Sequence, residues 1–418
     1  MIRPMAKQLI GVARFRRARL MQTVALVACL CLFSVDRAHA ETLMLLDGTT
    51  VRGAVEGLDD GLLKVKGGKD VELGRVWRIE RSNRPVGKAP DQTVATIHLL
   101  GGGKIHAVKL ATAEGEVRFD WLGGREAALP LNDVRAVRFK FKPAGDAALD
   151  PTPFIEASRA ERSRRDALFI EREGKLLSVE GVLEAIGPKK LTFRFNDESR
   201  TIDRDKVFGL TLATTAEPPE AVGWAGVVLV DGSSVWGRPV SLADGAMQLD
   251  RTGEARLDVP WAKVHHVDFN SPRLAFVDEL DPVREVANAI VTYAWPMRRG
   301  RNVMNQTMKI GDQAYDRGLG VHAESRLAYD LDGRFDRFIA TIGVDASTAE
   351  LGDCVFRVEG DGRELLSQRM RGSDGAKTIR VDVGDVERLE LVVEAGENLD
   401  IGDRANWANA RLIRAAGE

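Results

Sequence analysis

The chain has 418 residues, of which 44% are hydrophobic and 29% are charged, and this composition excludes disorder as its dominant state. The first 40 residues carry seven Lys or Arg and one Asp, so the remaining chain has 53 basic and 61 acidic residues, a formal charge of −8. A chain this acidic disfavours nucleic acid as its main partner.

Residues 1–40 have the pattern of a secretory signal peptide. Six basic residues precede the apolar run 20–35, and Ala38-His39-Ala40 has the small-x-small pattern that signal peptidase cleaves. We therefore expect a secreted or periplasmic chain that begins at Glu41 and has no membrane attachment after cleavage. An uncleaved anchor is the alternative, because sixteen apolar residues approach the shortest membrane span. A lipoprotein signal at Cys29 is disfavoured, because the apolar run continues past it.

Cys354 is the only cysteine after this leader, so no internal disulfide is expected. It stands in GDCVFRV, where alternation predicts a buried residue of a strand rather than a catalytic thiol.

Four copies of one small β unit follow the leader. Segments 41–83 and 224–270 both contain an apolar strand, an Asp-Gly turn, a strand with an internal Gly, a second Asp-Gly turn and two further strands. Asp-Gly between alternating runs is a strong hairpin signal. Weaker copies occupy 93–141 and 167–213, separated by a linker, 142–166, whose second half suits a short polar helix.

Each copy is expected to form a small β-barrel-like unit of about five strands, since a mid-strand Gly favours a sharp bend. Units this small are marginally stable alone, so we expect the four copies to pack against one another. The order and spacing of their strands and turns resemble those of Sm-like barrels, which commonly bind RNA. The export signal and the acidic charge argue against RNA here.

The last segment, 274–418, has a different pattern. Apolar and polar residues alternate over several runs separated by turns, which indicates half-buried antiparallel sheets. Roughly eight strands in about 140 residues predict a β-sandwich of jelly-roll type. The expected fold class is therefore all-β, with tandem barrel-like repeats followed by a sandwich.

Several motifs of this segment resemble the NPCBM/NEW2 family of carbohydrate-binding modules, which is related to galactose-binding β-sandwich modules. The matching stretches are 318–325, 329–333, 335–338, 343–345, 355–362 and 403–408. One position departs, since Arg404 stands where the family often has His. The resemblance implies a sandwich that binds a glycan, of galactose type in related modules, and in some members a bound calcium.

A sugar site needs an aromatic face for C–H stacking and polar groups that reach hydroxyls. The candidates for sugar contact are Trp295, Trp407, His322, Glu324 and Asp403. Two of them have structural alternatives: bonding to a backbone carbonyl for His322, and a place in the core or in a lid for Trp407. Asp345 and Asp403 are candidate calcium ligands, because carboxylates suit a hard cation, although turn capping explains them equally well.

Elsewhere the sequence offers little chemistry. Gly101-Gly102-Gly103-Lys104 looks faintly like a phosphate-binding loop, but no helix pattern follows it, so a hairpin turn is favoured. The chain after the leader lacks the common hydrolase and metalloprotease motifs, and paired carboxylates are too frequent to nominate a catalytic pair.

The sequence thus predicts a secreted, non-catalytic carbohydrate-binding protein, with the β repeats as a scaffold and no required cofactor other than the calcium noted above. The first alternative is an exported adaptor whose repeats bind protein partners. The second is an enzyme associated with glycoside hydrolysis, which has less support.

Overall fold

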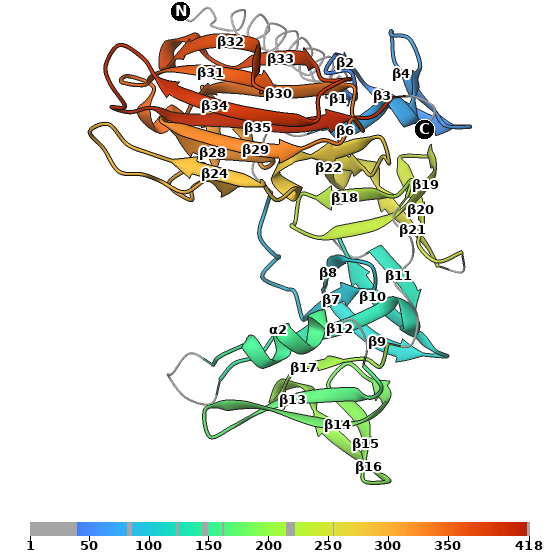
Figure 1. Ribbon diagram of the computed structural model, residues 1–418. Coiled ribbons are helices and arrows are strands. Elements are labelled where there is room, and N and C mark those ends of the chain that lie inside the picture. The colour runs from blue at the N-terminus through green and yellow to red at the C-terminus, as the bar shows by residue number, and fades with distance from the viewer. Residues whose placement is uncertain are drawn as a thin grey trace, which may run out of the picture. The chain divides into compact units, whose positions relative to one another are not determined.

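The computed structural model describes residues 40–81, 86–122, 125–143, 149–160, 163–214, 222–253 and 255–415. Apart from Ala40, the predicted signal peptide lies outside these residues. Antiparallel strands dominate the described part of the chain, which confirms the all-β class (Figure 1). Among the described residues, no helix has the length and apolar character needed to cross a bilayer.

The four copies share one strand order. The first contains β1 (Glu41–Leu45), β2 (Thr50–Gly53), β3 (Val55–Asp59), β4 (Leu62–Val65), β5 (Val71–Glu72) and β6 (Val76–Glu80). The second contains β7 (Ala95–Leu99), β8 (Gly103–Ala107), β9 (Lys109–Ala113), β10 (Glu116–Trp121), β11 (Arg125–Pro130) and β12 (Val134–Phe139). The third contains β13 (Asp166–Arg172), β14 (Lys175–Ile186), β15 (Lys190–Phe195), β16 (Glu198–Asp203) and β17 (Val207–Thr211). The fourth contains β18 (Ala225–Leu229), β19 (Ser234–Ala243), β20 (Ala246–Asp250), β21 (Arg256–Pro260) and β22 (Val264–Phe269).

In every copy the first strand pairs with both the second and the last strand, and a three-residue 3-10 turn precedes the last strand. The second strand is long and bent in the third and fourth copies. In the third copy the bend lies at Gly181. Only Gly fits at this position, because a Cβ there would lie 2.3 Å from the Arg194 carbonyl oxygen. The helix α2 (Thr152–Arg159) lies in the expected linker.

The copies associate in pairs through their last strands. β6 pairs with β22, with Ile79 opposite Val267, and β12 pairs with β17, with Val137 opposite Leu210. Each of these residues is the fourth of its strand, so each pair is arranged about a local two-fold axis. This pairing confirms that the copies pack against one another.

A buried ion pair links the second and fourth copies. Arg251 and Asp133 are joined by bonds of 2.6 Å from Nε and 2.9 Å from Nη2, and both side chains are fully buried. Arg251 Nη2 also donates to the Leu100 carbonyl at 2.7 Å. These bonds satisfy much of the hydrogen-bonding capacity of the guanidinium group in a place that water does not reach.

Residues from 274 onward form two facing antiparallel sheets. One sheet has the order β25 (Arg298–Arg299), β28 (Gly318–His322), β35 (Arg404–Ile413), β30 (Arg337–Val344) and β33 (Lys377–Asp382), with β23 (Leu274–Phe276) also on β35. The other has the order β24 (Arg284–Ala287), β29 (Ser325–Asp330), β34 (Arg388–Ala395), β31 (Asp353–Gly360) and β32 (Arg363–Arg371). A hairpin of β26 (Met308–Ile310) and β27 (Gln313–Tyr315) flanks them. The predicted sandwich is therefore present.

The core of the sandwich follows the predicted alternation. Leu327 and Tyr329 of β29 and Ile379 and Val381 of β33 are buried in one apolar cluster, which also contains the fully buried Cys354. The expectation that Cys354 is a core residue is confirmed. Burial also raises the pKa of its thiol, which disfavours the reactive thiolate.

Candidate functional site

Three loop segments meet at one end of the sandwich, at residues 288–297, 322–324 and 396–403, and we call this region the loop end. Two backbone bonds join them. Asn288 N donates to the Glu324 carbonyl at 2.8 Å, and Ala323 N donates to the Asp403 carbonyl at 3.1 Å. Most of the residues predicted to contact sugar belong to these segments.

Asp400 fixes the first of these segments. Its carboxylate is fully buried and accepts bonds from Ile290 N and Val291 N, both at 2.9 Å, and from Thr292 N at 3.2 Å and Thr292 Oγ1 at 2.7 Å. Burial alone would raise the pKa of Asp400, but these hydrogen bonds outweigh burial and hold the pKa well below its usual value. A permanently ionised Asp400 therefore anchors residues 290–292.

The anchored segment presents aromatic and aliphatic side chains to solvent. Tyr293 is 78% exposed, and its ring lies edge-on to the half-buried ring of Trp295, with centroids 6.3 Å apart and planes at 80°. Ile290 and Val291 beside them are 49% and 56% exposed. Exposed apolar groups on a fixed loop suit the C–H face of a sugar ring.

His322 and Glu324 lie in the adjoining segment. The His322 imidazole is mostly buried, and its Nδ1 donates to the Ala323 carbonyl, which is an acceptor only. Burial lowers the pKa of His322, so the ring is neutral at pH 7 and its Nε2 is an acceptor. Half-buried Glu324 accepts from Ala395 N at 2.8 Å through Oε1.

Trp407 is not part of this surface. Its indole is fully buried in the sandwich, with its centroid 4.9 Å from that of Phe356 and 6.2 Å from that of Phe338. The prediction that Trp407 stacks on a sugar is therefore wrong for this conformation, because neither ring face meets solvent.

Asp403 is also fully buried, and its Oδ1 accepts from Asp353 N at 2.7 Å. Burial raises the pKa of Asp403 to about 7, and the neighbouring Asp353 and Asp400 contribute in the same direction. Its carboxyl supports the loop end from inside and does not reach a ligand on the surface.

Donors from the protein itself already occupy the carboxylate oxygens of Asp345. Its oxygens accept from Ser347 Oγ at 2.6 Å and Ser347 N at 3.1 Å, from Asn406 Nδ2 at 2.8 Å, from Asn302 Nδ2 at 3.2 Å and from Lys309 N at 3.3 Å. N–H groups that face these oxygens do not fit a calcium ion at the same place. Within the described residues no cluster of three or more His, Cys, Asp or Glu suits a metal. Calcium binding by Asp345 or Asp403 stays a prediction.

The sequence did not identify Asp400 and Tyr293 as site residues. Asp400 follows a turn-rich stretch that looks like any surface loop, and its partners at 290–292 lie about 110 residues earlier. A possible signal for Tyr293 was its spacing of two from Trp295 in TYAWP, which places two aromatics in one short segment.

Residues 275–413 match the model of the family described as the NPCBM/NEW2 domain, which confirms the resemblance for this third of the chain. A curated protein of Renibacterium salmoninarum, named "Putative endo-alpha-N-acetylgalactosaminidase", is 34% identical over 110 residues. The aligned part is 26% of this chain and 7% of that relative, so the chain corresponds to only a small part of it.

Two solved structures from Clostridium perfringens are also similar. A CBM51 module of GH95 in complex with methyl-galactose is 23% identical, covering 33% of this chain and 99% of the module, with a TM-score of 0.30. The CBM51-2 and INT domains of ZmpB in complex with GlcNAc are 20% identical, covering 41% of this chain and 37% of that one, with a TM-score of 0.32.

Proposed function

We propose, from the premise that residues 275–413 form an NPCBM/NEW2 domain, that this chain is an exported, non-catalytic protein that binds a glycan at the loop end. The β repeats serve as its scaffold. The observation that carries the proposal is the aromatic pair of exposed Tyr293 and half-buried Trp295, which follows directly on the segment that the buried Asp400 fixes in place.

The chemistry at the loop end suits a neutral sugar. The Tyr293 and Trp295 rings provide the apolar surface. The neutral His322 ring, which is 5% exposed, would accept a hydrogen bond from a hydroxyl that reaches its Nε2. Because the segment is fixed before binding, little conformational entropy is lost when a sugar docks. The ligands to test first are methyl-galactose and GlcNAc.

The carboxylates of the loop end support a non-catalytic function. Hydrolysis of a glycosidic bond commonly needs two carboxyl groups that face the scissile bond. At the loop end the Asp400 carboxylate accepts backbone hydrogen bonds and Asp403 is buried. Glu324 accepts from Ala395 N through Oε1, and Glu397 forms an ion pair with Arg369 at 2.8 Å. These four groups do not supply a free pair.

The test uses the chain from residue 41 on a glycan array, followed by calorimetric titration with the sugars that bind. Tyr293→Ala and Trp295→Ala should each weaken binding about tenfold, since one stacked aromatic contributes roughly 1 to 1.5 kcal/mol. Leu365→Ala is the control, because Leu365 is 39% exposed on β32 and lies outside the loop segments.

Unchanged affinity in the Tyr293→Ala, Trp295→Ala double variant would exclude the loop end as the sugar site. No binding to any glycan on the array would favour the adaptor function, in which the repeats bind protein. Release of free sugar from a bound glycan by the purified chain would contradict the non-catalytic assignment.

A further inference from the structure

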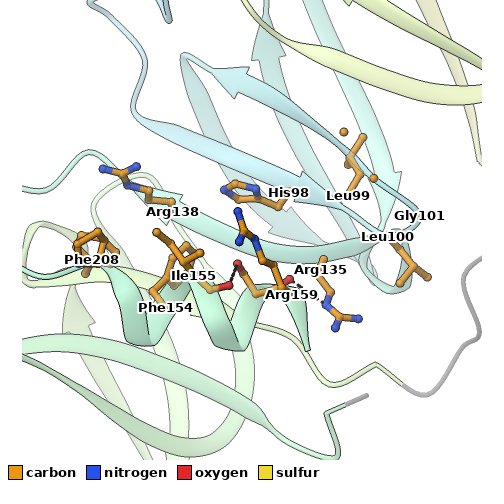
Figure 2. A pocket seen from close by; sticks show the side chains of 14 residues that line it. His98, Leu99, Leu100, Gly101, Arg135, Arg138, Phe154, Ile155, Arg159 and Phe208 are labelled. Carbon is orange, nitrogen blue, oxygen red and sulfur yellow. Dashed lines mark hydrogen bonds between the residues drawn. The ribbon is translucent and has the colours of Figure 1, made fainter. Parts of the chain in front are cut away.

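A pocket of about 550 Å³ lies between the second copy, α2 and β17 of the third copy (Figure 2). Its walls come from β7, β12, the turn between β7 and β8, α2 and β17, and none of the described residues that line it belongs to the loop end. The lining residues used below are His98, Arg138, Phe154, Ile155, Arg159 and Phe208. This volume is in the range typical of small-molecule sites.

The apolar wall of the pocket is formed in advance. Phe154 of α2 is 2% exposed and makes edge-on contacts with Phe169 and Phe208, with centroids 5.4 and 5.5 Å away. The His98 ring lies 6.2 Å from the Phe154 ring, also edge-on. These contacts hold α2 against the second and third copies, so the cavity does not depend on a ligand for its shape.

The opposite rim consists of glycine backbone without side chains. Gly101, Gly102 and Gly103 all have positive φ and form the turn between β7 and β8, so the hairpin predicted there is confirmed. The preceding Leu100 is held on both sides. Its N–H donates to the Asp133 carbonyl at 2.8 Å, and its carbonyl accepts from Arg251 at 2.7 Å.

The pocket is cationic. Arg138 of β12 and Arg159 at the end of α2 line it, and none of its described lining residues is Asp or Glu. The Arg138 guanidinium lies 5.4 Å from the centre of the Phe208 ring. In Figure 2 the Arg159 side chain extends from α2 toward His98. Burial, together with the positive charges of Lys104 and Arg138, lowers the pKa of His98 to about 4.

We propose that this pocket binds a small organic anion. Its carboxylate, phosphate or sulfate group would be attracted by the positive charges of Arg138 and Arg159, and its apolar or ring body would lie against Phe154, Ile155 and Phe208. Arginine suits such a group because its planar fork of donors matches two oxygens at once. The site is separate from the proposed glycan site and does not depend on it.

The test is calorimetric titration of the chain from residue 41 with phenyl phosphate, benzoate, inorganic phosphate and phenol. Phenyl phosphate or benzoate should bind more tightly than inorganic phosphate, and phenol should not bind. The stronger of the two aromatic anions identifies the preferred acidic group. Binding should weaken as salt is raised, because the attraction is screened.

Arg159→Gln and Arg138→Gln should each weaken anion binding about tenfold, the loss expected for one charge-assisted hydrogen bond. Arg200→Gln is the matched control, because Arg200 is an exposed arginine of β16 that pairs with Glu198 outside the pocket. Arg138 and Arg159 are both solvent-exposed, unlike the third lining arginine, the buried Arg135, so neither substitution should prevent folding.

Equal binding by the wild type and the Arg138→Gln, Arg159→Gln double variant would overturn the proposal. So would binding of phenol as strong as that of phenyl phosphate, or no binding of either aromatic anion. Sugar binding at the loop end, measured on the same variants, should not change, so failure of one proposal is distinguishable from failure of the other.

Discussion

The buried carboxyl of Asp403 should make the sandwich less stable as pH rises from acidic to neutral. The pKa of this group is raised from 3.8 to about 7 in the folded chain, chiefly by burial and further by Asp353 and Asp400. Between these two values the unfolded chain releases a proton that the folded chain retains. Folding stability therefore falls with rising pH across this window, and the loss is complete above about pH 7.

The magnitude follows from the two pKa values. A tenfold change in an equilibrium constant corresponds to about 1.4 kcal/mol, so a pKa rise of about three gives a loss of about 4 kcal/mol. Asp403→Asn removes the ionisable group and should abolish this loss. The variant should gain stability relative to the wild type at pH 8, and should gain nothing at pH 4, where the wild-type carboxyl is protonated.

The assay is urea unfolding of both proteins at several values between pH 4 and pH 8.5. Asp312→Asn is the control, because Asp312 is an exposed acid in the β26–β27 turn. The informative quantity is the difference between wild type and variant, since carboxylates that do not interact with Asp403 act equally in both. Parallel stability profiles for the wild type and Asp403→Asn would refute the reasoning.

Three other outcomes are expected. Trp407→Ala should cost about 3 to 5 kcal/mol of unfolding free energy in urea, as for a large aromatic in a core, whereas a Trp407→Phe variant that keeps full stability but loses sugar binding would contradict our placement of this residue. Arg251→Met should cost about 3 to 5 kcal/mol by calorimetry because it leaves Asp133 buried without its partner, and the further change Asp133→Leu should restore part of that loss. Asp400→Asn should weaken sugar binding several-fold while leaving anion binding in the pocket unchanged, and equal sugar affinity would show that residues 290–292 need no anchor.

The repeats could be predicted because their signals are local. At Asp60-Gly61 and Asp244-Gly245 both residues of the turn have positive φ, the conformation that Asp-Gly favours in a two-residue hairpin. The sandwich was predictable for a similar reason, since strict alternation places every second residue on one face.

The candidate site could be predicted only in part, because exposure depends on contacts that are distant in the sequence. The sequence around Trp407 does not distinguish it from an exposed residue. Trp407 is nevertheless buried, because it belongs to β35, which lies between β28 and β30 in its sheet and is buried along nearly its whole length. The anchoring of residues 290–292 by Asp400 joins segments about 110 residues apart. No local pattern in either segment specifies that contact.

The order in which the copies pair has a consequence during synthesis. The second and third copies pair through strands about 70 residues apart, whereas β6 of the first copy must wait for β22, about 190 residues later. At roughly 5 to 20 residues per second, a ribosome needs on the order of 10 to 40 s to supply that partner. Until then one side of β6 is an open hydrogen-bonding edge that other chains can join. The nested order thus leaves this edge of the first copy unpaired for longer than the corresponding edge of the second copy.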